Sequence, residues 1–279
     1  MPLILVPTPI GNLEDITLRA LRLLREADII ACEDTRTTSV LLKRYNINSR
    51  LISYHAHNER ERSEKLIDML LEGKVIALVS DAGTPGISDP GYTILKLALE
   101  NNIKIDVLPG ANALLPALLL SGLPPYPFFF YGFPPEKKGE RRELLSQLSS
   151  LPYTLCFYLS PHKGAKQLID MLEIFGDRRA SLVREISKIY QEATLASLSA
   201  IRDRLDEGVK GELVLLVSGD EKNCENNAKA NEWKLLIPEM VNNGMSVRDI
   251  IEEILQKVKG ISKNEIKNTV LAEKNKHPD

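Results

Sequence analysis

The stretch KVIALVSDAGTPGISDPGYTILKLALENN (residues 74–102) places a strand, an irregular loop and a helix one after the other. Its first part, KVIALVS, is apolar after the lysine, which is typical of a strand buried on both faces. Helical periodicity begins near Gly91, and we expect Asp89 to cap the helix and Pro90 to take its first position. The segment SDAGTPGISDPG lies between the two elements, and loops this irregular are usually functional. The stretch therefore predicts an α/β fold with a ligand loop at the end of a buried strand.

The sequence on either side repeats this alternation of short apolar runs and amphipathic segments. The apolar runs predict strands at residues 3–6, 28–32, 50–54 and 103–110. The amphipathic segments predict helices at residues 17–27, 38–45, 58–73 and 112–122. Strands that alternate with helices imply right-handed βαβ units and a parallel sheet. We expect this first domain to span residues 1–122 and to end at the proline-rich segment LPPYP.

A second α/β domain is expected at residues 123–219. Its predicted strands are residues 128–132, 153–160, 179–185 and 211–219, and its predicted helices are residues 138–148 and 161–176. Residues 189–198 fit either a strand or a loop. A polar linker at residues 220–232 leads to a helical C-terminal region at residues 233–279, where Ser246 and Ser262 begin capping boxes. The predicted fold is thus two α/β domains with a small helical tail.

The composition restricts the class of protein and its partners. With 43% hydrophobic and 27% charged residues, the chain of 279 residues has an ordinary globular composition. Its net charge of -2 argues against a generic nucleic-acid coating protein, so RNA binding would need a local basic patch. No apolar stretch approaches the length of a membrane span and no basic segment precedes one, so we expect neither a transmembrane helix nor a signal peptide. Three widely spaced cysteines suit free thiols in a reducing cytoplasm.

Three loops follow predicted strands of the first domain: residues 6–12 (VPTPIGN), 80–91 and 108–113 (LPGANA). Ligands of open α/β sheets bind beyond the carboxyl ends of the strands, and glycine lets the backbone approach them closely. We expect the three loops to gather at one edge of the sheet. None contains a lysine, an arginine or a metal-binding cluster, so we expect no metal and no phosphate-rich cofactor. Such loops favour a ligand with a cationic centre and no phosphate, and S-adenosylmethionine is one.

Two further motifs have an ordinary structural explanation beside a functional one. YHAHN places His55 and His57 two residues apart, but a zinc site needs further ligands, so structural or substrate-facing roles are favoured. CEDTRT gathers Glu33, Asp34 and Arg36 at the end of a predicted strand. This group is either a helix cap with an ion pair or a cluster that orients the substrate.

The segments VPTPIGNLEDIT, ACEDTR, YHAHNE, SDAGTPGISDPG, LPGANA, FYGFPP, SPH and RE occur in this order between Leu3 and Gly219. Together they resemble the small-subunit ribosomal RNA methyltransferases of the tetrapyrrole (corrin/porphyrin) methylase superfamily. The first and fourth segments are the most specific. The resemblance implies a homodimer of two-domain α/β subunits with S-adenosylmethionine in the cleft between the domains. It also implies methyl transfer to the 2'-oxygen of a cytidine ribose in 16S ribosomal RNA of the small ribosomal subunit.

The positions that match the family's cofactor site come from both domains. The cofactor-binding residues implied by the resemblance are Pro9, Ile10, Asp81, Thr84, Ile87, Asn112, Ala113, Leu159 and Gly211. The chain departs from the family pattern at Ala56 and Leu159, where the family has glutamate, and at Lys163, where it has arginine. These departures weigh against a mechanism that needs a carboxylate at position 56 or 159.

The acceptor hydroxyl must lose its proton, and several groups are candidates for the general base. Besides water, they are Glu33, Asp34, His162 and Glu185. The basic side chains that we expect to hold the RNA backbone are Arg36, Lys137, Arg141 and Arg184. The segments SPHK and EKKGERR, which supply some of these residues, also fit ordinary helix starts.

Two other functions stay open. One is a C-methyltransferase acting on a porphyrinoid, against which the VPTPIGN opening and the helical tail weigh. The other is a non-catalytic RNA-binding factor in ribosome assembly, against which the intact glycine loops weigh.

Overall fold

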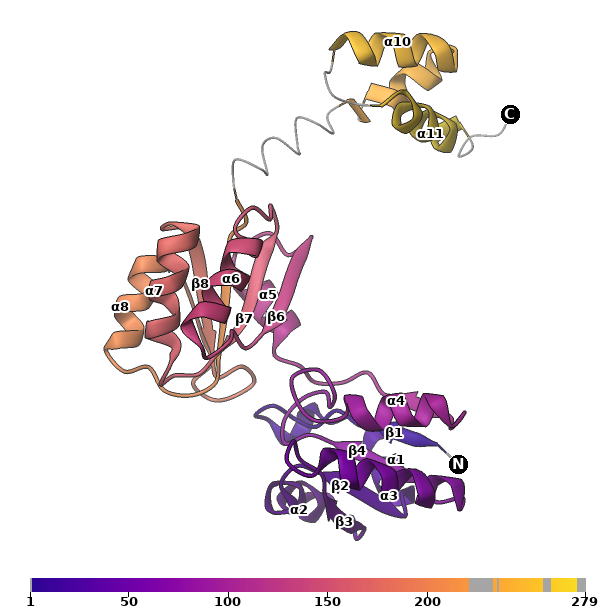
Figure 1. The fold of residues 1–279 in the computed structure, drawn as a ribbon, viewed down its shortest axis with the longest axis vertical. Helices are drawn as coiled ribbons and strands as arrows, with labels where there is room; N and C mark the ends of the chain where they lie inside the picture. Colours follow the sequence, from indigo (N-terminus) through magenta and orange to yellow (C-terminus); the bar gives the residue numbers. More distant parts are fainter. Residues whose placement is uncertain (1, 221–232, 235, 258–261, 275–279) are drawn as a thin grey trace.

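The computed structural model describes residues 2–220, 233–234, 236–257 and 262–274. Two five-stranded sheets form its main body (Figure 1). The strands of the first sheet are β1 (Leu3–Leu5), β2 (Ile29–Cys32), β3 (Arg50–Ser53), β4 (Ile76–Val79) and β5 (Ile105–Val107). Their order is β3-β2-β4-β1-β5, and every neighbouring pair is parallel. The predicted parallel sheet is therefore confirmed.

Helices cover both faces of the first sheet. They are α1 (Leu18–Glu26), α2 (Thr35–Arg44), α3 (Glu59–Leu71) and α4 (Tyr92–Glu100). Successive residues of a strand point to opposite faces, so Ile4 of β1 packs with α1 and α2, whereas Leu3 and Leu5 pack with α3 and α4. Burial on both faces explains why β1 and β4 are continuous apolar runs in the sequence.

The second sheet is mixed. Its strands are β6 (Phe128–Gly132), β7 (Thr154–Leu159), β8 (Arg179–Arg184), β9 (Glu192–Ser197) and β10 (Leu213–Val217). The order is β6-β7-β10-β8-β9, in which β6 and β7 are parallel and the other pairs are antiparallel. Residues 189–198, which fit either a strand or a loop in the sequence, mostly form the edge strand β9.

Strand β10 is buried on both faces, and each face meets different helices. Leu213, Leu215 and Val217 face α6 (Lys138–Leu148), α7 (Gly164–Phe175) and α8 (Leu198–Asp206). Val214 and Leu216 face α5 (Leu114–Leu120), which precedes the second sheet in the chain. The helix α8 is absent from the prediction made from the sequence.

The C-terminal region contains α10 (Val247–Lys257) and α11 (Lys263–Lys274), which share a core with Trp233. The hydroxyl of Ser246 accepts a hydrogen bond from the Asp249 N–H at 3.2 Å, as the predicted capping box requires. Of the predicted linker, residues 221–232 lie outside the part of the chain that the structure describes. No helix within the described residues is long and apolar enough to cross a membrane.

Candidate active site

The three glycine-containing loops of the first domain lie at one edge of its sheet. They leave the carboxyl ends of β4, β1 and β5, which are neighbours in the sheet and run in the same direction. Register places Leu5 opposite both Leu78 and Val107, so the three strands end at the same level. The gathering of the loops that the sequence predicts is therefore confirmed.

Hydrogen bonds tie the first two loops together. The N–H of Thr8 donates to the carbonyl of Gly83 and the N–H of Gly83 donates to the carbonyl of Thr8, each at 2.9 Å. The Thr8 hydroxyl donates to the Ser80 carbonyl at 2.9 Å. The third loop packs against the first, because a Cβ added at Gly110 would lie 2.6 Å from Cβ of Pro7. Only glycine allows this approach, so the loops form one rigid wall.

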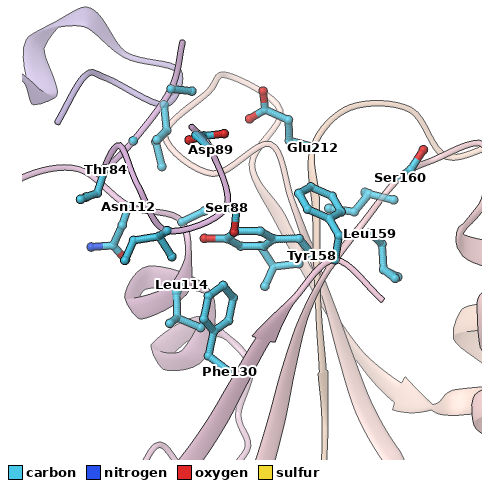
Figure 2. Close-up of a pocket in the computed structure, with 18 of the residues that line it drawn as sticks. Thr84, Ser88, Asp89, Asn112, Leu114, Phe130, Tyr158, Leu159, Ser160 and Glu212 are labelled. Atoms are coloured by element: carbon cyan, nitrogen blue, oxygen red, sulfur yellow. The ribbon is translucent and has the colours of Figure 1, made fainter. Parts of the chain in front are cut away.

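A pocket of about 760 Å³ lies between this wall and the second sheet. On the first side it is lined by the loops and the start of α5, and on the second by β6, β7 and residues 211–214. Figure 2 shows the ring of Tyr158 extending from the second sheet toward the loop of Ser88 and Asp89, with Phe130 beside Leu114. The volume is within the usual range for sites that bind small molecules and cofactors.

The lining of the pocket is mostly apolar and carries no positive charge. None of the described residues that line it is a lysine, an arginine or a histidine. Two are acidic, Asp89 and Glu212. Such a lining suits a ligand with a cationic centre and does not suit a phosphate.

The structure brings most of the predicted cofactor residues together. Those that line the pocket are Ile10, Thr84, Ile87, Asn112, Ala113, Leu159 and Gly211. Pro9 and Asp81 do not line it. The Asp81 carboxylate instead accepts a hydrogen bond from the Asp34 N–H at 3.0 Å, which joins the ends of β2 and β4.

The predicted catalytic residues Glu33 and Asp34 do not line the pocket. Burial raises the pKa of the Glu33 carboxyl, and the carboxylates of Asp81, Asp89 and Asp34 raise it further. Hydrogen bonds from the side chain and backbone of Arg36 lower the pKa of Asp34 to about 2. Asp34 is therefore a helix cap in an ion pair, which is the structural alternative stated for the sequence motif.

Glu185 holds the segment of Gly211 and Glu212, which lines the pocket, through a hydrogen bond. Its carboxylate accepts hydrogen bonds from the Glu212 N–H and from Nζ of Lys188, both at 3.0 Å. The N–H of Glu212 is the main cause of the lowered pKa of Glu185. The fourth catalytic candidate, His162, is exposed and follows Pro161, which lines the pocket.

The predicted RNA-binding residues have different environments. Arg36 and Lys137 are exposed and pair with acidic residues of their own segments. Arg184 is partly buried and pairs with Glu192 at 2.9 Å. Arg141 is buried, and its guanidinium donates to Asp170 at 2.5 Å and to two backbone carbonyls. Arg141 thus connects α6 to α7 inside the second domain and is unavailable to a phosphate.

The sequence predicts that Asp89 caps α4, which is wrong, and it predicts no role for Tyr158. Helix α4 begins at Tyr92 and receives no side-chain cap from Asp89. The cap comes from Glu59, whose carboxylate accepts hydrogen bonds from the N–H groups of Gly91 at 2.9 Å and Thr93 at 3.2 Å. The position of Asp89 inside the glycine loop was the available signal that it lines the pocket.

Comparisons with known proteins identify the family and the fold. The sequence model of the Tetrapyrrole (Corrin/Porphyrin) Methylases matches residues 2–202. A protein of Halalkalibacterium halodurans named "Ribosomal RNA small subunit methyltransferase I" is 43% identical over 95% of this chain and 93% of its own length. A protein of Bacillus subtilis (strain 168) with the same name is 42% identical over 90% of this chain and 88% of its own length.

Solved structures share the fold at low sequence identity. Cobalt precorrin-4 methyltransferase matches with a TM-score of 0.60 and 17% identity, covering 78% of this chain and 94% of that one. Uroporphyrin-III-C-methyltransferase from Thermus thermophilus matches with a TM-score of 0.57 and 20% identity, covering 82% of this chain and 97% of that one. The predicted fold class is confirmed. From its two sheets, the loops between them and these matches, we conclude that the chain belongs to the tetrapyrrole (corrin/porphyrin) methylase family.

Proposed function

We propose that this protein transfers a methyl group from S-adenosylmethionine to the 2'-oxygen of a cytidine ribose in the 16S RNA of the small ribosomal subunit. The observation that carries the proposal is the pocket between the two sheets, whose described lining contains glycine loops and acidic residues but no cationic side chain. Family membership supports methyl transfer. The names of the relatives support ribosomal RNA as the substrate class.

The pocket fits S-adenosylmethionine in size and in charge. Ile10 and Leu159 offer apolar surface to an aromatic ring, and Asn112 offers a polar side chain. The carboxylates of Asp89 and Glu212 give the pocket the negative charge that suits a sulfonium ligand. When bound, S-adenosylmethionine supplies a methyl group that is already activated. The task of the protein is then to align the acceptor oxygen, exclude water and accept a proton.

The proposed RNA surface includes two exposed cations, Arg36 and Lys137. The side chain of Arg36 is 88% exposed at the start of α2, and that of Lys137 is 82% exposed next to α6. Arg36 pairs with Asp34, and Lys137 pairs with Glu140. Ion pairs of such exposed cations contribute little stability, so a phosphate can replace the acidic partner at little cost. A nucleotide in an RNA loop can be splayed out of its stack into such a pocket, and only RNA carries the 2'-hydroxyl.

We further propose that the protein is a homodimer. Strand β6 lies at the edge of the second sheet, and Phe129 and Tyr131 of this strand are exposed. Leu119 of α5 and Tyr126 are also exposed. Exposed edge strands and apolar patches are sites of association, and a second copy of the chain would cover them.

A cytoplasmic location is also proposed. The thiols of Cys32 and Cys156 are free and buried, which suits a reducing compartment. Ribosomal subunits, the proposed substrate, are present in that compartment as well.

The test is to incubate the protein with methyl-labelled S-adenosylmethionine and, in separate reactions, small ribosomal subunits, free 16S RNA or uroporphyrinogen. We expect label in RNA alone, recovered after nuclease digestion as 2'-O-methylcytidine. Label in the porphyrinoid would instead establish the C-methyltransferase. Failure to bind the cofactor would favour the non-catalytic assembly factor.

A further inference from the structure

Asp89 differs from the other acidic residues around the pocket in the groups that surround it. Of the described residues that line the pocket, only Asp89 and Glu212 are acidic. The side chain of Glu212 is 66% exposed, and its Oε2 lies 3.3 Å from Nζ of Lys188. Asp89 is half-buried and pairs with no described lysine or arginine. Its negative charge is therefore not neutralised by the protein.

The structure also removes the ordinary explanation for an aspartate at this position. An aspartate just before a helix usually caps it, but Glu59 already accepts the hydrogen bonds of the Gly91 and Thr93 N–H groups at the start of α4. The Asp89 side chain lies at the pocket instead, on the loop that faces the Tyr158 ring (Figure 2). Asp89 thus has no structural task at the helix that it precedes.

The groups around Asp89 make its carboxylate a stronger base. Burial raises the pKa of Asp89, a hydrogen bond from Ser80 lowers it in part, and the carboxylate of Asp81 raises it. On the other side of the pocket, burial and the charge of Asp89 raise the pKa of Tyr158, which therefore keeps its proton at neutral pH. Glu33 lies close enough to be affected by the Asp89 charge as well. A general base is most effective when its pKa approaches the working pH.

We propose that Asp89 is the general base of the reaction, an assignment that rests on the function proposed above. As the ribose 2'-oxygen forms its bond to the methyl carbon, its proton passes to a carboxylate oxygen of Asp89. The sulfur keeps the electron pair of the bond that breaks, and Asp89 later releases the proton to water. None of the four candidates from the sequence lines the pocket, so Asp89 replaces them in this role.

The test compares Asp89→Asn with Glu100→Gln, which makes the same carboxylate-to-amide change at the exposed far end of α4. Three quantities are measured: the single-turnover rate of RNA methylation, the affinity for S-adenosylmethionine by calorimetry, and the thermal unfolding midpoint. We expect Asp89→Asn to lower the rate about a hundredfold or more, a loss much larger than any accompanying loss of cofactor affinity. We expect Glu100→Gln to match the wild type in all three.

Two readouts distinguish proton transfer from a supporting role. The wild-type kcat/KM should rise with pH along a limb above 3.8, the ordinary aspartate value, and this limb should be missing in Asp89→Asn. In protein with ¹³C-labelled aspartate carboxyls, a resonance titrating above 3.8 should disappear with the same substitution. A variant that keeps its rate, or loses only cofactor affinity, overturns the assignment and leaves the proposed function intact. A wild type that methylates no RNA overturns both.

Discussion

Because Gly211 has no side chain, the Glu185 carboxylate can lie close to the backbone at the wall of the pocket. A Cβ at this position would lie 2.4 Å from Oε1 of Glu185, and the backbone φ of Gly211 is +101°. Gly211→Ala should therefore push Glu185 off the Glu212 N–H and lower the free energy of unfolding by about 1–3 kcal/mol beyond the backbone strain. It should also weaken cofactor binding.

Gly208→Ala is the matched control for this change. Its φ is +100°, so it carries similar backbone strain, but a Cβ there would meet nothing within 4 Å. Urea unfolding of both variants isolates the contact with Glu185, because the strain is common to them. Equal losses of stability would show that Glu185 does not hold the loop.

Local sequence identified the site residues that sit in the glycine loops and missed those defined by distant contacts. Thr84 and Asn112 belong to loops that follow neighbouring strands, so fold class and motif together predicted their place at the pocket. Arg141 looked like a phosphate contact because its partner, Asp170, is distant in sequence. Asp89 looked like a cap because nothing near it shows that Glu59 takes that position.

At the scale of elements, Glu59 of α3 supports the start of α4. Glu59→Ala should lower the free energy of unfolding at pH 7 by about 1–2 kcal/mol, since two N–H groups of α4 lose their acceptor. Glu61→Ala, which removes an exposed partner of Lys65 on the same helix, should cost less than about 0.5 kcal/mol. Denaturant unfolding of the two variants measures this difference. Similar losses would mean that the cap contributes little.

The same cap predicts a dependence of stability on pH. Burial alone would raise the pKa of Glu59, but hydrogen bonds from Gly91, Thr93 and Tyr54 outweigh it and lower the pKa below its ordinary 4.5. A lowered folded-state pKa means that the stabilisation is complete above 4.5 and is lost as the pH falls through the folded value. The difference between wild type and Glu59→Ala should therefore shrink in acid. A difference that stays constant down to strongly acidic pH would contradict the assignment.

Elements with strong apolar patterns were predictable, and those with weak patterns were not. Strands β1, β4 and β10 are buried on both faces, so their sequences are continuous apolar runs. Strand β9 lies at a sheet edge and alternates exposed and half-buried residues, which left its sequence ambiguous. Helix α8 was missed, although Leu198, Ile201 and Leu205 form a helical stripe, because it follows β9 without a loop.

At the scale of the whole molecule, the proposed RNA binding has to rely on local exposed cations, because the chain as a whole is nearly neutral. Affinity for small-subunit RNA should fall steeply as salt increases, and Arg36→Ala should reduce the slope of log K against log salt by about 1. Arg22→Ala removes an exposed, ion-paired arginine from the middle of α1 and should leave the slope unchanged. Filter binding across a salt series measures both slopes. An unchanged slope in Arg36→Ala would remove this residue from the RNA surface.

The exposed apolar edge of the second domain predicts self-association. Leu119→Glu puts a charge on a side chain that is 77% exposed on α5, and it should shift the dimer toward monomer by at least about tenfold in Kd. Leu71→Glu changes an exposed leucine of the first domain and should leave the dimer intact. Sedimentation velocity over a range of concentrations tests this. A wild type that is monomeric at micromolar concentration would contradict the proposed dimer.

Helix α5 belongs to the first half of the chain by sequence but packs on the second sheet through Ala117 and Leu118. Any rotation of one sheet relative to the other must therefore bend the backbone between Val107 and Leu114, ahead of this helix. That hinge contains Asn112, which lines the pocket. A rotation of one sheet relative to the other would therefore change the shape of the ligand cavity, and a molecule that fills the cavity would oppose that rotation.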